Sequence, residues 1–94
     1  MRISAQEKEH ILVTVRRFDA DARIILFGSR ADDTKRGGDI DLLILSSAIG
    51  GTEKRRIRGM LCDALGDQRI DIIVAADTRD PIVRIAQETG VALR

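Results

Sequence analysis

The chain has few aromatic residues, a single cysteine and a net charge close to zero. Phe18 and Phe27 are its only aromatic residues among 94, and tyrosine and tryptophan are missing altogether. This excludes the aromatic platforms on which many proteins stack single-stranded nucleic acid. Cys62 has no second cysteine with which to form an internal disulfide, which favours a reducing compartment.

Long apolar runs and an excess of one charge are also missing. Charged residues make up 33% of the chain, but they nearly cancel to a net charge of +1. No strong attraction to nucleic acid or to an anionic membrane is therefore expected. No apolar stretch approaches the roughly 18 residues of a membrane-spanning helix, and the charged N-terminus does not resemble a signal peptide. We expect a cytoplasmic protein without direct nucleic-acid or membrane partners.

The pattern of apolar residues predicts one small domain over residues 1–94, in the α/β (α+β) class. Buried strands are expected at residues 23–27, 39–45 and 69–75. Ser4 with Glu7 forms a capping box for a first helix that ends near Asp19. Further helices are expected after Gly28, between Thr52 and Gly66, and from Asp80 to Thr89. This order predicts a small mixed sheet with flanking helices.

Acidic residues interrupt two of these apolar strands. Asp39 and Asp41 are separated only by Ile40, and Asp71 lies alone among apolar residues of the third strand. Alternation places Asp39 and Asp41 on one face of the sheet, with Cα atoms about 6.6 Å apart. An isolated acid in a strand commonly faces solvent, but carboxylates buried together require a neutralising cation. If the strands are neighbours, the three acids match the ligands of a Mg²⁺ site for phosphoryl or nucleotidyl transfer.

A glycine turn precedes the acids. Gly28 and Ser29 follow the first strand directly, and a glycine here lets the backbone approach a ligand closely. Backbone N–H groups at the start of a helical turn attract anions such as phosphate. Arg30 either contacts a phosphate or the acceptor, or pairs with a nearby carboxylate, and the sequence leaves both open.

Together these residues resemble a known signature. Gly28-Ser29, nine intervening residues and Asp39-Ile40-Asp41 are similar to the motif of the DNA polymerase β-like nucleotidyltransferase superfamily. With Arg30, Ala31 and Leu42 included, the match resembles the minimal nucleotidyltransferase (MNT) group, over about residues 20–75. The resemblance implies that Gly28 and Ser29 bind the ATP triphosphate, that Asp39 and Asp41 hold Mg²⁺, and that Asp71 completes the site. Relatives often read Gly-Ser-Arg-Ala-Arg-Gly, whereas Asp32 and Asp33 follow Ala31 here.

The resemblance also implies a function. Many MNT proteins are antitoxins that transfer AMP to a tyrosine hydroxyl of a HEPN-family ribonuclease toxin. A chain of 94 residues leaves no room for the helical domain of larger relatives, so a protein partner is expected to supply the acceptor. One alternative is an antitoxin that masks its partner sterically without catalysis. Another is nucleotidyl transfer to a small molecule, as in aminoglycoside-modifying relatives.

Overall fold

A computed structural model describes residues 3–28, 39–66 and 68–94. Helices and strands alternate irregularly along the chain. The elements are α1 (Ala5–Phe18), β1 (Arg23–Phe27), β2 (Ile40–Leu45), α2 (Gly51–Leu65), β3 (Ile70–Ala75), α3 (Pro81–Thr89) and β4 (Val91–Leu93). No helix within these residues is both long enough and apolar enough to cross a membrane.

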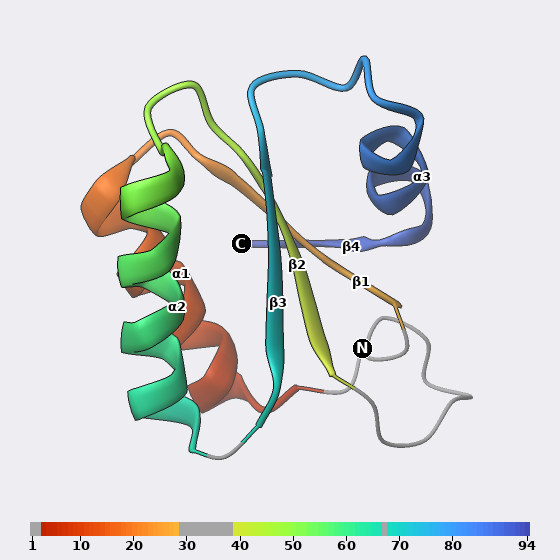
Figure 1. Ribbon diagram of the computed structural model, residues 1–94. Coiled ribbons are helices and arrows are strands. Elements are labelled where there is room, and N and C mark those ends of the chain that lie inside the picture. The colour runs from red at the N-terminus through yellow and green to blue at the C-terminus, as the bar shows by residue number, and fades with distance from the viewer. Residues whose placement is uncertain (1–2, 29–38, 67) are drawn as a thin grey trace.

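The four strands form one mixed sheet in the order β3-β2-β1-β4. Strands β2 and β3 run parallel, whereas β1 is antiparallel to both of its neighbours, β2 and β4. Helices α1 and α2 pack on one face of the sheet, and α3 lies on the other (Figure 1). The predicted fold class, a small mixed sheet with flanking helices, is confirmed.

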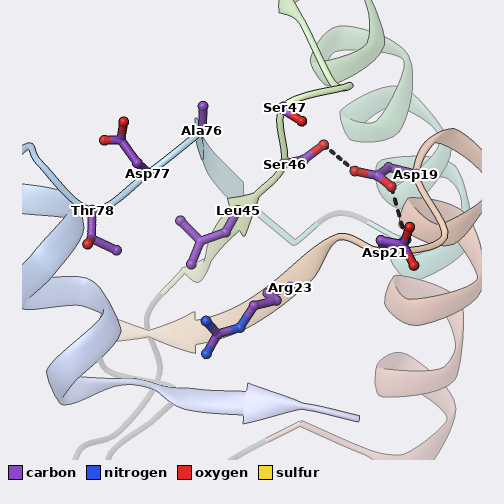
Figure 2. A pocket seen from close by; sticks show the side chains of 9 residues that line it. All are labelled: Asp19, Asp21, Arg23, Leu45, Ser46, Ser47, Ala76, Asp77 and Thr78. Carbon is purple, nitrogen blue, oxygen red and sulfur yellow. Dashed lines mark hydrogen bonds between the residues drawn. The ribbon is translucent and has the colours of Figure 1, made fainter.

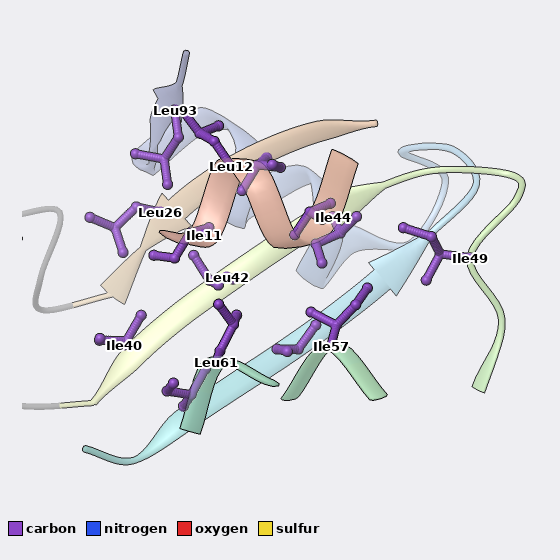
Figure 3. Close-up of a cluster of buried hydrophobic side chains, with 14 residues drawn as sticks. Ile11, Leu12, Leu26, Ile40, Leu42, Ile44, Ile49, Ile57, Leu61 and Leu93 are labelled. Atoms are coloured by element: carbon purple, nitrogen blue, oxygen red, sulfur yellow. The ribbon is translucent and has the colours of Figure 1, made fainter. Parts of the chain in front are cut away.

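Strand alternation divides the apolar side chains into two clusters. The larger cluster fills the space between the sheet and helices α1 and α2 (Figure 3). Its fully buried members include Ile11, Leu26, Leu42, Ile57 and Leu61. A smaller cluster packs on the α3 face and consists of Ile25, Leu43, Val83 and Ala86. Residues that alternate with Leu42, among them Asp41, therefore face α3 and not the main core.

The predicted helix ends are largely confirmed. Ser4 accepts a hydrogen bond from the Glu7 N–H at 3.0 Å, and the Glu7 carboxylate accepts one from the Ser4 N–H at 2.9 Å. Asp80 caps α3 by accepting from the Ile82 N–H at 2.9 Å, with Pro81 in the first turn. Gly66 ends α2 with a φ of +80°, a conformation that side chains with a Cβ rarely adopt.

Two sequence expectations need correction, and one lies outside the described residues. Helix α2 begins at Gly51 with Gly50 as N-cap, not at Thr52, because Glu53 accepts a hydrogen bond from the Gly50 N–H at 2.8 Å. Strand β4 was not predicted; it follows Gly90 directly and pairs with β1. The short helix expected after Gly28 falls on residues that the structure does not describe.

Candidate functional site

Three aspartates gather where β2 and β3 begin. The two strands are parallel and in register, so that Asp41 lies opposite Asp71, while Asp39 directly precedes β2. Two residues further along each strand, Leu43 belongs to the cluster on the α3 face and Ile73 packs against it. Because side chains alternate along a strand, Asp41 and Asp71 point to this same face. The juxtaposition that the sequence suggested for the three acids is present.

Gly28 brings the end of β1 against the same group. Phe27 pairs with Asp41 across the β1–β2 ladder, and Gly28 follows with a φ of +73°. A Cβ atom placed on Gly28 would collide with the Asp41 carboxylate. Glycine is thus required here for two reasons, the left-handed backbone and the close approach of a carboxylate.

The electrostatics of Asp41 differ from those of an ordinary surface acid. Partial burial raises the pKa of the Asp41 carboxyl above its usual value of 3.8, and the negative charges of Asp71 and Asp39 raise it further. The positive charge of Arg69 acts in the opposite direction but does not cancel the rise. Among the described residues, the repulsion at Asp41 thus outweighs the attraction of Arg69.

Among the described residues, Arg69 is the cation that pairs with these acids, and the sequence analysis did not assign it a role. Its Nε lies 3.6 Å from Asp39 Oδ2 and 3.7 Å from Asp71 Oδ2. Its carbonyl accepts a hydrogen bond from the Ile40 N–H at 2.9 Å, which fixes its backbone beside Asp39. The signal available in the sequence was its position two residues before Asp71, which puts both side chains on one face.

The donor chemistry of this site fits a hard divalent cation. Three carboxylates supply oxygen ligands of the kind that Mg²⁺ prefers, and in the described part of the chain a single arginine, Arg69, pairs with them. Within the described ranges, however, no group of three His, Cys, Asp or Glu side chains is already disposed to hold an ion. The Arg69 guanidinium lies between two of the three carboxylates. A metal ion held by these carboxylates would need a different arrangement of their side chains from the one described.

Ser29 and Arg30, the other two candidate phosphate-binding residues, lie outside the described residues.

Gly28, the last described residue before them, also borders an apolar groove formed by Phe27, Gly28, Ile82, Ile85, Ala86 and Thr89. Ile82 and Ile85 are 64% and 59% exposed, the highest values for large apolar side chains in the described ranges. The only polar side chain of this lining, Thr89, donates its hydroxyl to the Ile85 carbonyl at 2.8 Å.

A second depression lies at the opposite end of the sheet and also contains acids. Asp19, Asp21 and Asp77 line it together with Arg23 and Ser46 (Figure 2). Here the Ser46 hydroxyl donates to Asp19, and this hydrogen bond lowers the pKa of the Asp19 carboxyl. A second hydrogen bond, from the Asp21 N–H at 2.9 Å, adds to the effect. These contacts connect the end of α1 to the end of β2 and so stabilise the fold.

The sheet with helices on both faces defines a small α/β domain whose carboxylates, at the starts of two neighbouring strands, suit metal-bound phosphates. The chain belongs to the nucleotidyltransferase domain family, whose model matches residues 8–93. Membership confirms the resemblance at the family level and indicates transferase chemistry, for which such domains generally use a nucleoside triphosphate and a divalent metal.

Among solved structures, the chain is similar to a crystal structure described as the toxin-antitoxin MntA-HpeT, in a mutant with two aspartates changed to glutamate. The two share 22% sequence identity with a TM-score of 0.70. The alignment covers 93% of this chain and 72% of the other. This likeness shows a shared fold. No curated protein matches the sequence.

Proposed function

We propose that this chain is a Mg²⁺-dependent nucleotidyltransferase that transfers AMP from ATP to a tyrosine hydroxyl of a HEPN-family toxin, and so acts as an antitoxin. The observation that carries the proposal is the meeting of Asp39, Asp41 and Asp71 beside the Gly28 turn. Family membership supports nucleotidyl transfer, and the similar fold of a protein described as a toxin-antitoxin supports the choice of partner.

The residues take the following roles in the proposal. Gly28, with Ser29 and Arg30 beyond it, binds the triphosphate through backbone N–H groups and side-chain donors. Asp39 and Asp41 hold Mg²⁺, with Asp71 as a third ligand. When bound, Mg²⁺ would neutralise phosphate charge as the negative charge of the leaving group develops.

The reaction then follows in-line displacement. The tyrosine oxygen forms a bond to the α-phosphorus, the bond from that phosphorus to the bridging oxygen breaks, and pyrophosphate leaves. Asp71 accepts the hydroxyl proton, and its side chain is 44% exposed, which leaves it accessible to an acceptor hydroxyl. Because ATP is the donor, we place the reaction in the cytoplasm, and we assign the activity to residues 1–94 as a single domain.

The test is intact mass spectrometry of a HEPN protein co-expressed with this chain. Each transferred AMP adds about 329 Da, the mass of the nucleotide less water. The addition should map to a tyrosine and should disappear in Asp39→Asn and Asp41→Asn. Asp77→Asn, an exposed acid at the opposite end of the sheet, is the matched control and should keep full transfer.

The same experiment separates catalysis from steric masking. An antitoxin that only covers its partner would neutralise the toxin without any mass change, and its Asp41→Asn variant would neutralise equally well. Unmodified partner in the presence of the wild-type chain would refute AMP transfer. Modification of an added aminoglycoside without any partner would instead favour a small-molecule acceptor.

A further inference from the structure

Arg69 occupies the carboxylate cluster in a way that suggests a role beyond a surface ion pair. Its Nε lies nearly midway between one oxygen of Asp39 and one oxygen of Asp71, at 3.6 and 3.7 Å. These are two of the three carboxylates to which the proposed function assigns the metal. The guanidinium therefore lies beside carboxylate oxygens of Asp39 and Asp71 that would also bind a divalent cation.

The backbone determines this placement. The Ile40 N–H donates to the Arg69 carbonyl at 2.9 Å, which extends the parallel ladder by one hydrogen bond beyond the start of β3. Arg69 is thereby held level with Asp39, and its side chain lies on the same face as Asp71 two residues later. The side chain itself is 71% exposed, so packing against the described residues does not hold it in place.

Charge explains why a cation is needed at this position. Asp41 lies opposite Asp71 in the parallel register and Asp39 directly precedes β2, so three negative charges are brought together where the two strands begin. Without a counter-charge the three acids repel one another at the end of two hydrogen-bonded strands. Arg69 lowers this repulsion in the metal-free protein, and a bound divalent cation would lower it more strongly.

We propose that Arg69 is an internal counter-cation that competes with the divalent metal for Asp39 and Asp71. Arg69 stabilises the metal-free cluster, weakens its affinity for a free cation, and must leave when the metal binds. The inference rests on the proposed function, because it takes the metal ligands from there. It makes Arg69 a positioning residue whose effect is exerted on the carboxylates.

The test measures binding of Mn²⁺ alone, by isothermal titration calorimetry, to the purified full chain. Arg69→Gln removes the competing charge and should tighten Mn²⁺ binding by about three- to tenfold, the range expected from two partly exposed ion pairs. Arg69→Lys keeps the charge and should stay within about twofold of the wild type. Arg79→Gln is the matched control, since Arg79 pairs with the exposed Asp77 at the other end of the sheet, and the Mn²⁺ affinity of this variant should equal that of the wild type.

Thermal unfolding supplies a second readout. Metal-free Arg69→Gln should unfold at a lower temperature than the metal-free wild type. Saturating Mn²⁺ should raise the unfolding temperature of Arg69→Gln by more than it raises that of the wild type. Equal Mn²⁺ affinity in Arg69→Gln and Arg79→Gln, or weaker binding in Arg69→Gln, would overturn the proposal. Asp41→Asn identifies the source of a failure. If it leaves Mn²⁺ binding intact, the proposed metal site itself is wrong, whereas if it abolishes binding while Arg69→Gln has no effect, only the competition is wrong.

Discussion

The two ends of the sheet both carry aspartates, but in opposite electrostatic situations. At one end Asp19 accepts hydrogen bonds from the Ser46 hydroxyl and the Asp21 N–H, and its pKa is lowered. At the other end Asp41 is partly buried beside two further carboxylates, and its pKa is raised. The fold satisfies the first acid with hydrogen bonds and places the second beside like charges. An acid that stabilises the fold and an acid suited to a ligand can thus be told apart within one small domain.

The largest expected effect concerns Asp41, and it separates activity from stability. Asp41→Asn removes a ligand of the proposed metal and should lower AMP transfer at least about 100-fold, as expected if several kcal/mol of charge stabilisation are lost. The same change removes a partly buried charge that two neighbours repel. The midpoint of urea unfolding at neutral pH should therefore rise in the metal-free variant. A midpoint that falls would mean that Asp41 supports the fold as Asp19 does.

Gly28, which lies beside the Asp41 carboxylate, can be compared with Gly90, which lies in a packing contact. Gly28→Ala forces a Cβ into the Asp41 carboxylate and into a left-handed conformation, which costs roughly 1–2 kcal/mol from the backbone alone. We expect a loss of stability and, because Asp41 must move, a loss of metal affinity. Both can be measured by denaturation and by Mn²⁺ titration.

Gly90→Ala is the matched control for Gly28→Ala. A Cβ on Gly90 would meet the Ile25 side chain and two backbone oxygens. Gly90 is distant in sequence from the three aspartates and lies on the β4 side of the sheet. It should lower stability without changing the affinity of the folded protein for Mn²⁺. Equal losses of metal affinity in both variants would show that Gly28 has no special relation to Asp41.

The contrast between these positions also shows what the sequence could reveal. The convergence of Asp39, Asp41 and Asp71 was predictable because strand periodicity fixes the face, and only the adjacency of the two strands had to be assumed. For Arg69, alternation indicates the face that it shares with Asp71, but its contact with Asp39 was not predictable, because it depends on the parallel register that sets Arg69 level with Asp39. Strand periodicity alone could not reveal that register.

Helix ends with side-chain caps were read correctly, whereas features that depend on the backbone were missed. Ser4 and Asp80 can be recognised as N-caps because their capping hydrogen bonds join residues that are close in sequence. The start of α2 depends on Gly50, whose N–H bonds the Glu53 carboxylate, and Thr52 two residues later looked like the better cap. Strand β4 has only three residues, too few for an alternating pattern, and it exists because β1 offers a free edge to pair with.

At the opposite end of the sheet, Ser46 should matter for stability alone. Its buried hydroxyl donates to Asp19 and accepts from the N–H groups of Ala48 and Ile49 at 3.0 and 3.1 Å. Ser46→Ala leaves these groups without that partner and should cost about 1–3 kcal/mol in the free energy of unfolding. Ser47→Ala, an exposed neighbour, should cost little. The Mn²⁺ affinity of the folded protein should not change in Ser46→Ala. A change would show that the two ends of the sheet are energetically coupled.

The smallest effect, and the most direct test of the contrast, is the pH dependence of stability. A carboxyl whose pKa is raised on folding binds its proton more tightly in the folded state. Asp41 therefore favours folding below 3.8 and progressively loses that contribution as pH rises through its folded pKa. Asp19 has the opposite sign: its contribution is present above 3.8 and is lost as pH falls through its lowered folded pKa.

The two variants Asp41→Asn and Asp19→Asn should consequently diverge from the wild type in opposite directions near neutral pH. As pH falls, the stability gained in Asp41→Asn should shrink first, because the folded-state titration of Asp41 begins above 3.8. The stability lost in Asp19→Asn should persist until below that value. Urea denaturation of metal-free protein from about pH 7 to pH 3 measures both differences. Curves that shift in the same direction at neutral pH would show that hydrogen bonding and like-charge burial do not distinguish these two acids after all.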